Sequence, residues 1–480
     1  MRRLRWYDYI TINIYWLGLT TLSQTNGLIQ PLLVQKFVGP AQQGTAFGRL
    51  RLYTLMVALL VQALSGMLSD RSTLRWGRRR PFILIGTLLN IGCMVAIGAS
   101  PTYWALFIAV LFSQMASNIA HGAEQGLIPD LVPEEQRGRF SGIKATLEVP
   151  IPLILVAFTV GPLISQGNIW GGIAVTNSIL LLSMVITMFV PEKPLPRTWA
   201  RPLDWKAFGQ LVVMTLVFLL VILGMGEVVN KVGRLLHTIR SIPILTLVMG
   251  GTGLLAMTIA VIVGVWTCVY ISLGKQAARR HPSFVWWVVN RLAFLIGTHN
   301  LSTFAVYFLQ ARLNLEGEAA AQPASRLMMM IGILILLSAL PSGWLADRIG
   351  RKRLVALSGL TAAVGTGVLI STANLTVIYV GGCIVGAATG IFFTTNWALG
   401  TDLVPKEAAG QYLGISNLAG AGAGALGSYI GGPIADYFTQ HVGQAPGMGY
   451  ILIFAIYAGL FLLSSCVLIK VQETWQGKRK

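Results

Sequence analysis

Two short basic loops, each set between long apolar runs, constrain the fold of this 480-residue chain more than any other feature. The first loop covers residues 66–81 and the second covers residues 343–353, and each has an acidic residue followed by several arginines. Charge without compensation is costly to bury in hydrocarbon, so in a membrane protein both loops must lie in water. An excess of Arg and Lys is typical of loops on the cytoplasmic side. The pattern predicts a polytopic helical membrane protein with both basic loops on one side.

Composition excludes an ordinary soluble domain. Hydrophobic residues make up 54% of the chain and charged residues 11%, against roughly 25% charged in a soluble domain. The net charge of +19 could indicate nucleic acid, but the cations cluster in short loops between apolar runs. We therefore expect contact with membrane lipid and no nucleic-acid partner. The amino terminus has no small-residue cleavage site, and the four cysteines are widely separated, so we expect no signal peptide, disulfide framework or metal site.

Motifs recur at nearly constant separation along the chain. Three pairs of residues carry the repeat, at intervals of 273, 272 and 271 positions: Gly77 with Gly350, Asp130 with Asp402, and Gly161 with Gly432. Several matches in one register indicate that the chain is a duplicated half, which is a parallel-repeat architecture.

The loop at 343–353 resembles the signature between the second and third helices in each half of major facilitator superfamily transporters. The loop at 66–81 has four more residues between Asp70 and Gly77, and with its Trp-Gly-Arg-Arg-Arg-Pro-Phe run it resembles that of sucrose–proton symporters and their glycoside–cation relatives. The resemblance implies an all-α polytopic fold, with two six-helix bundles in parallel repeat. It also implies secondary transport of a sugar by alternating access.

At about 20 apolar residues per span, the chain predicts fourteen spans, six in each bundle and a central pair. We expect bundles at 1–190 and 284–480, and between them a linker and central helices at 191–283. The expected spans are 9–35, 47–69, 82–99, 102–129, 139–165, 169–190, 207–228, 242–273, 284–311, 326–347, 353–371, 376–402, 410–436 and 447–470. An even number of crossings keeps both termini cytoplasmic. The turn at 230–240 carries cations on the expected outer side, so an interfacial segment that does not cross fully is the alternative.

The fourth predicted span carries a polar stripe. Gln114, Asn118, His121 and Gln125 follow at steps of four, three and four, so they share one helix face. Interhelical hydrogen bonding is one interpretation. We favour the lining of a cavity, because a titratable His and the adjacent Glu124 are expensive inside a membrane.

Aromatic faces stack on sugar rings, while amides and hydroxyls bond the hydroxyl groups. The first, seventh and tenth helices of the two bundles carry further residues of this kind, although Trp is also common at membrane interfaces and His299 could be a satisfied hydrogen-bonding residue. Arg291 and Lys144 are expected near helix ends, which favours a neutral solute. The predicted substrate-binding residues are Trp16, Gln24, Asn26, Gln114, Asn118, His121, Gln125, His299, Thr303, Tyr307, Asn396 and Trp397.

Proton coupling is implied by the symporter resemblance, in which the position of Gln114 is a carboxylate. A Gln cannot exchange a proton, so the candidates are His121, Glu124 and Glu148. We favour Glu124, which the stripe surrounds. Glu148 has a second interpretation, as the ion-pair partner of Lys144 four residues earlier.

The basic loops suggest a conformational latch at the cytoplasmic ends of the bundles, with loop folding alone as the alternative. The latch residues are predicted to be Asp70, Arg71, Arg78, Arg79, Arg80, Asp130, Asp347, Arg348, Arg351 and Asp402.

The sequence therefore predicts a monomeric secondary transporter of a sugar or glycoside in the cell membrane, driven by protons. Efflux of an amphipathic compound and a non-transporting receptor on the same fold are the alternatives. We find no nucleophile–base motif, no metal-ligand spacing and no phosphate loop, so we expect no enzyme activity, no cofactor and no ATP-driven mechanism.

Overall fold

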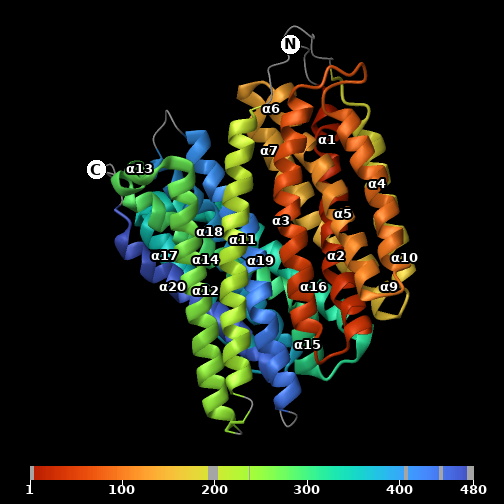
Figure 1. Ribbon diagram of the computed structural model, residues 1–480. Helices are drawn as coiled ribbons and strands as arrows, with labels where there is room; N and C mark the ends of the chain where they lie inside the picture. Colours follow the sequence, from red (N-terminus) through yellow and green to blue (C-terminus); the bar gives the residue numbers. More distant parts are fainter. Residues whose placement is uncertain are drawn as a thin grey trace. The chain divides into compact units, whose positions relative to one another are not determined.

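The computed structural model describes residues 5–192, 204–236, 238–239, 241–404, 409–442 and 447–472. Throughout these residues the regular structure is helical, and they contain no strand (Figure 1). Three parts of the predictions lie outside the described residues: linker positions 193–203, His237 and Arg240 of the central turn, and the basic tail at 477–480.

Each predicted span coincides with a helix or a run of short helices. The helices of the first part are α1 (Asp8–Thr11), α2 (Ile14–Val38), α3 (Gln43–Asp70), α4 (Arg80–Gly98), α5 (Tyr103–Glu124), α6 (Leu127–Leu131), α7 (Arg137–Glu148), α8 (Pro150–Leu155), α9 (Gly161–Ser165) and α10 (Ile169–Thr187). The rest are α11 (Trp205–Leu235), α12 (Ile242–Leu273), α13 (Lys275–Arg280), α14 (Pro282–Thr303), α15 (Ala305–Leu313), α16 (Ala321–Ile349), α17 (Arg351–Ile370), α18 (Leu375–Leu403), α19 (Ala409–His441) and α20 (Met448–Val467).

By length and apolar composition, eleven helices of the described chain can cross a membrane, or twelve if the bent pair α14–α15 counts as one span. That pair bends by 57° at its break. The long helices α2 and α19 are outside this count. Along α2, polar residues such as Thr20, Ser23, Gln24 and Gln30 lower the hydropathy of the helix. The chain is thus a multi-pass membrane protein.

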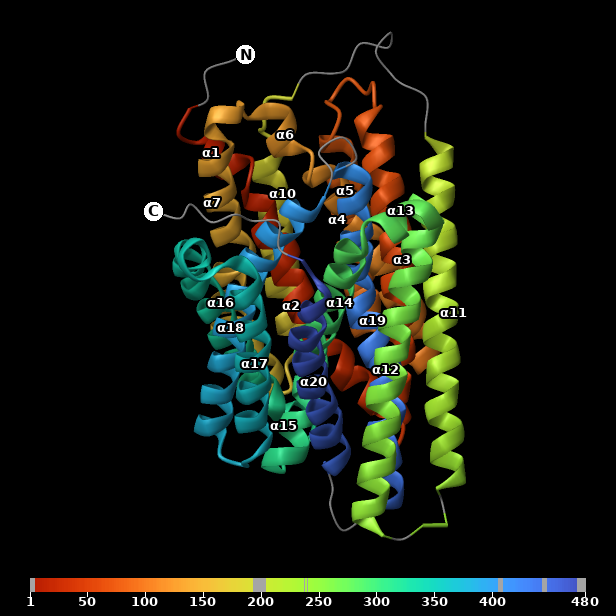
Figure 2. The same ribbon diagram turned by 90° about the vertical axis from the view of Figure 1, so that its left-hand side faces the viewer.

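The chain forms two compact units. Unit 1 comprises Met1–Leu33, Tyr53–Leu211 and Ala321–Met329, and unit 2 comprises Val34–Leu52, Val212–Ala320 and Met330–Lys480. Within unit 1, α4 packs against α5 and α10. Within unit 2, α14 packs against α19 and α20, and α17 packs against α18 and α20 (Figure 2). The central helix α12 packs against α14, α19 and α20, so it belongs to the core of unit 2.

Small residues permit the closest of these contacts. A Cβ atom added to Gly381 of α18 would lie 2.7 Å from the backbone nitrogen of Leu369 and 2.8 Å from the carbonyl oxygen of Gly365, both on α17. The backbones of the two helices therefore approach each other directly, as is usual where helices pack inside a membrane.

We predict that Gly381→Val lowers the thermal stability of the protein in detergent, because the side chain would force α17 and α18 apart. Overpacking of this kind costs about 1–3 kcal/mol. Gly367→Val is the matched control, since a Cβ at Gly367 of α17 meets nothing within 4 Å. Equal melting temperatures for the two variants would contradict this packing.

Candidate functional site

Three side chains from three helices of unit 1 meet in a polar cluster. The indole of Trp16 on α2 and the imidazole of His121 on α5 are edge-to-face, with ring centroids 5.2 Å apart. The ammonium of Lys144 on α7 lies 3.7 Å from the centroid of the Trp16 ring. The aromatic face stabilises this cation inside the helical bundle. Lys144 was expected only near a helix end, and its contact with Trp16 was not predicted.

Glu124 lies at the carboxyl end of α5, within this cluster. The side chain is 1% exposed, and neither carboxylate oxygen has a hydrogen-bond partner among the described residues. The positive charge of Lys144 acts on both Glu124 and His121, so the three groups share one electrostatic environment. A buried carboxyl without a donor is rare, because a native structure normally satisfies buried polar atoms.

Other members of the stripe on α5 make short-range contacts. The side-chain nitrogen of Gln125 lies 3.1 Å from Nε2 of His121, and Gln125 is exposed. Asn118 donates to the carbonyl of Gln114 one turn earlier, at 2.8 Å. On α2, Asn26 is buried and Gln24 is half-buried. The structure thus joins His121, Gln125 and Trp16, while Asn118 and Gln114 pair along their own helix.

Glu148 forms an ion pair with Lys144, with 3.6 Å between Nζ and Oε2. This is the contact expected from the second interpretation of Glu148. Since the Glu148 carboxylate has this partner, Glu124 is the carboxyl of the cluster that lacks one.

A second polar cluster lies in unit 2 between α14 and α18. Nη1 of Arg291 donates to Oδ1 of Asn396 at 3.1 Å, and Nδ2 of Asn396 donates to Oδ1 of Asn290 at 2.7 Å. The guanidinium lies 5.3 Å from the ring centroid of Trp397, which is 39% exposed. Arg291 sits well inside α14, so the expectation that it lies near a helix end is wrong. Arg51, inside α3, is a further intramembrane cation that was not predicted.

The predicted stripe on α14 and α15 faces more than one environment. His299 is exposed, and the positive charges of Arg51 and Arg291 both act on its ring. Thr303 donates to the carbonyl of His299 within the helix, at 2.9 Å. Tyr307 is fully buried, with its ring 5.8 Å from that of Phe47. The stripe therefore presents His299 to an open surface and packs Tyr307 in the core.

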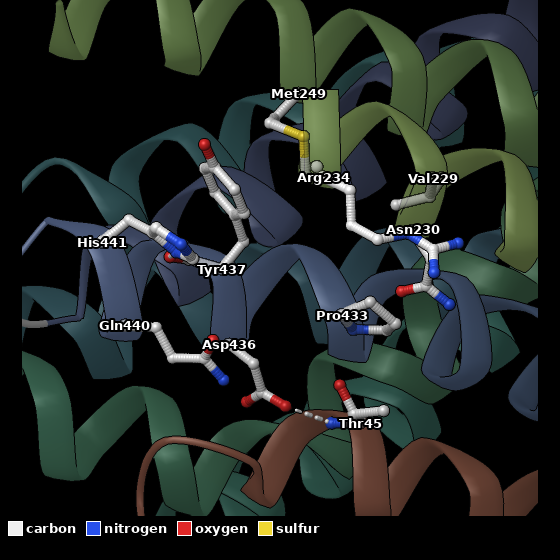
Figure 3. Close-up of a pocket in the computed structure, with 11 residues that line it drawn as sticks. Thr45, Val229, Asn230, Arg234, Met249, Pro433, Asp436, Tyr437, Gln440 and His441 are labelled. Carbon is white, nitrogen blue, oxygen red and sulfur yellow. Dashed lines mark hydrogen bonds between the residues drawn. The ribbon is translucent and has the colours of Figure 1, made fainter. Parts of the chain in front are cut away.

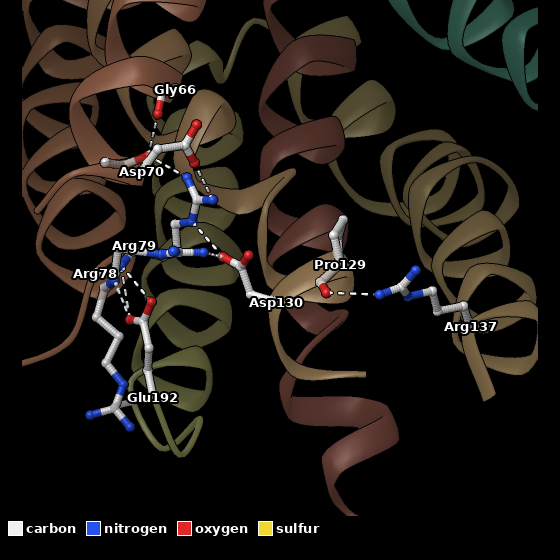
Figure 4. Close-up of polar contacts among 10 residues, drawn as sticks. Gly66, Asp70, Arg78, Arg79, Pro129, Asp130, Arg137 and Glu192 are labelled. Carbon is white, nitrogen blue, oxygen red and sulfur yellow. Dashed lines mark hydrogen bonds and ion pairs between the residues drawn. The ribbon is translucent and has the colours of Figure 1, made fainter. Parts of the chain in front are cut away.

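The first basic loop forms an ion-pair network inside unit 1 (Figure 4). Arg79 is 4% exposed, its Nε donates to Asp130 at 2.9 Å, and its guanidinium also pairs with Asp70. Arg78 pairs with the same Asp130 carboxylate. Burial lowers the pKa of Arg78, but the hydrogen bond and charge of Asp130 outweigh it, so the pKa of Arg78 is raised overall. The network joins the end of α3, the start of α4 and α6.

Glu192, which follows α10, completes this network and was not predicted. Its carboxylate accepts the backbone amide of Arg79 at 2.7 Å and that of Arg80 at 3.2 Å, at the N-terminus of α4. Unpaired amides at a helix N-terminus favour an acidic partner. Gly77, with φ of +111°, brings the loop against the same carboxylate. The position of an isolated acid just after the sixth span was the available sequence signal.

The second basic loop shares one ion pair with the first. Nη1 of Arg351 lies 2.5 Å from Oδ2 of Asp402, and the Arg348 guanidinium lies 3.8 Å from the ring centroid of Trp344. Asp347 is exposed and has no ion pair within the described part of the chain. The Arg351–Asp402 pair is thus the repeat equivalent of the Arg78–Asp130 pair, whereas Asp347 has no equivalent of the Asp70–Arg79 pair among the described residues. Arg71 of the first loop donates to the carbonyl of Met67 at 2.8 Å.

Unit 2 also contains a cavity of about 450 Å³, lined by residues of α3, α11, α12 and α19 (Figure 3). Asp436 of α19 is 3% exposed, and it accepts the backbone amides of Gly44 at 2.8 Å and Thr45 at 2.6 Å. This carboxylate thereby caps the N-terminus of α3. A Cβ on Gly44 would lie 2.7 Å from the carbonyl oxygen of Gly432, so the contact depends on glycine. None of this was predicted from the sequence.

The fold is a bundle of helices long and apolar enough to cross a membrane, and comparison with known proteins gives its family. The Major Facilitator Superfamily model matches residues 8–311 and 292–479, so the chain belongs to this family. It is 24% identical over 430 residues to the probable metabolite transport protein CsbC of Bacillus subtilis, covering 85% of this chain and 79% of that protein. It is 33% identical over 102 residues to the glucose transporter GlcP of Staphylococcus epidermidis, covering 21% and 22%.

Solved structures share the fold. A nucleoside transporter, NupG, aligns with a TM-score of 0.67 at 11% identity, covering 97% of this chain and 99% of the other. A D-xylose–proton symporter aligns with a TM-score of 0.64 at 17% identity, covering 99% and 100%.

We predict that Arg79→Gln destabilises the protein, because it leaves the carboxylates of Asp130 and Asp70 without their shared partner. Breaking a buried pair costs about 3–5 kcal/mol, and the partial exposure of both acids reduces this to about 2 kcal/mol. Arg75→Gln removes the same charge from an exposed side chain of the same loop and serves as the control. Equal free energies of unfolding for the two variants, measured by chemical denaturation, would contradict a stabilising role of Arg79.

Proposed function

We propose that this protein is a secondary active transporter that moves a small polar solute, a sugar or glycoside, by alternating access coupled to protons. The observation that carries the proposal is Glu124, a buried carboxyl without a hydrogen-bond partner, beside His121 and Lys144. Intramembrane ionisable groups are the usual elements of proton relays. The printed names of the relatives, a metabolite transport protein and a glucose transporter, support a solute of this class.

Each unit has its own set of side chains that we propose to contact solute. In unit 1, Trp16, Asn118, His121 and Gln125 would contact the solute, with Gln24, Asn26 and Gln114 near it. In unit 2, Asn396, Trp397 and His299 would contact it, with Thr303 and Tyr307 behind them. The side chains of Trp397 and Gln125 are exposed on their spans. An exposed amide such as that of Gln125 suits a water-filled cavity better than contact with lipid.

In the proposed coupling step, Glu124 takes up a proton when the cavity opens to the acidic side. Ionisation without a partner is costly in a buried site, so the neutral carboxyl and the charged carboxylate would prefer different conformations. His121 would hold the carboxyl or share the proton. The ion pair of Glu148 with Lys144 makes Glu148 the second choice.

The basic loops would act as the conformational latch proposed from their sequence. Asp70, Arg78, Arg79 and Asp130 form one network in unit 1, and Arg351 with Asp402 forms another in unit 2. Exchange of their partners between conformations would favour one state over another. Asp347 is exposed and would gain its partner only in the other state.

We predict that Glu124→Gln abolishes pH-driven accumulation of solute but preserves exchange of preloaded solute, because the amide cannot exchange a proton. Uptake of radiolabelled disaccharides and monosaccharides into vesicles, with and without a pH gradient, is the measurement. Glu148→Gln is the matched control and should still accumulate solute. The assignment fails if the Glu124 variant concentrates solute and the Glu148 variant does not.

We also propose fourteen crossings of the cell membrane, which adds α2, α19 and the α14–α15 pair to the helices that qualify by composition. Both termini and the two basic loops would then be cytoplasmic, and residues 312–325 would lie outside.

We predict that a single cysteine at Glu318 reacts with an impermeant maleimide added outside intact cells, while a cysteine at Arg75 reacts only after the cells are broken. The background would have Cys93, Cys268, Cys383 and Cys466 replaced. Labelling of position 75 from outside would exclude this topology.

A further inference from the structure

Arg291 carries a charge for which the described part of unit 2 offers no counter-charge. The side chain is half-buried inside α14, its Nε is buried without a hydrogen-bond partner, and its one hydrogen bond goes to the neutral amide of Asn396. No carboxylate forms an ion pair with it among the described residues. A cation withdrawn even partly from water without an anion is costly, which makes this position exceptional.

The described acids of unit 2 are committed elsewhere or lie at helix ends. Asp402 pairs with Arg351, Glu227 pairs with Arg234, and Asp436 caps α3. Asp347 lies in the last turn of α16, and Glu316 and Glu318 lie between α15 and α16. Because Arg51 adds a second positive charge that acts on the same exposed His299, the surroundings increase the excess of positive charge.

The groups around Arg291 form a surface with two kinds of contact. Its guanidinium lies 5.3 Å from the ring centroid of Trp397, whose side chain is 39% exposed. A planar guanidinium binds carboxylate and phosphate through paired donors, and an indole face binds the apolar face of a ring. The buried amide of Asn396 holds Arg291 in place, since it also bonds Asn290.

We propose that the transported solute carries an anionic group, a carboxylate or a phosphate, which Arg291 binds while the body of the solute packs on Trp397. This inference rests on the proposed transport function and narrows its substrate from sugars in general to anionic sugar derivatives such as sugar acids. It replaces the neutral solute expected from the sequence. Cotransport of a proton would offset the charge that such a solute brings across the membrane.

The test is binding to the purified full-length protein, measured by thermal stabilisation with charge-matched ligands. Glucose is the neutral ligand, glucuronate adds a carboxylate, and glucose 6-phosphate adds a phosphate. We expect at least one anionic ligand to bind about 10- to 100-fold more tightly than glucose. Arg291→Gln should remove this difference, and Arg291→Lys should restore part of it. The carboxylate and phosphate arms identify which anion is bound.

A merely structural role of Arg291, joining α14 to α18, predicts that Arg291→Gln weakens binding of all ligands alike or lowers stability alone. Equal binding of glucose and its anionic derivatives by the unaltered protein also overturns the inference. If Arg291→Gln does not fold, Arg51→Gln should still reduce anion preference, and an unchanged preference would count against the proposal.

Proton-driven accumulation of neutral sugar would leave the proposed function intact while excluding the anion site. Absence of transport for every sugar would instead remove the proposed function.

Discussion

The cost of placing charge inside an apolar helical bundle organises this structure. Most charges of the described chain lie in loops or at helix ends, and several of them find opposite charge: the buried Arg79 with Asp70 and Asp130, and the half-buried Arg351 with Asp402. Backbone amides at helix N-termini hold two further carboxylates, Glu192 at α4 and Asp436 at α3. Glu124 and Arg291 are exceptions, since neither has an ion-pair partner among the described residues. Ionisable groups that are costly to bury are usually kept for a functional role, so we treat these two as functional candidates.

In each unit a cation of the helical interior lies near an indole ring. Lys144 lies over Trp16 in unit 1, and Arg291 lies near Trp397 in unit 2. An indole face stabilises a cation without neutralising it. The charge thus remains available to a solute or to a proton-exchanging carboxyl. Unit 1 contains a cation and the carboxyl of Glu124, which has no hydrogen-bond partner among the described residues. In unit 2 the buried Asp436 carboxylate is held by backbone amides, and Arg291 has no ion-pair partner among the described residues. We assign proton exchange to the first and solute anchoring to the second on this difference.

Much of the fold could be predicted because hydropathy and loop charge report directly on burial. The ends of α4, α10 and α12 lie within about three residues of their predicted limits, since Pro, Gly and charged residues mark where the apolar runs stop. The repeat predicted the two basic loops and placed Asp130 and Asp402 at equivalent positions, where each pairs with an arginine of its loop. Asp70 and Asp347 occupy corresponding places in the two loops, yet Asp70 pairs with Arg79 and Asp347 has no ion pair among the described residues.

The candidate site was harder to predict than the fold. Helical periodicity placed Asn118, His121 and Gln125 on one face of α5, but it could not show that Lys144 reaches Trp16 from another helix. Arg291 was expected near a helix end, and its polar partner, Asn396, lies 105 positions away in the sequence, where no local pattern indicates the contact. The Asp436 contact with Gly44 joins residues 392 positions apart, and no local pattern indicates it.

The central claim is that solute movement and proton movement are one coupled process. It is tested most directly by solute-driven proton flux in proteoliposomes that contain a pH dye and no imposed pH gradient. Addition of a transported solute outside should acidify the lumen, in proportion to solute entry, with the membrane potential clamped. Solute entry at the same rate with no change of internal pH would contradict the account.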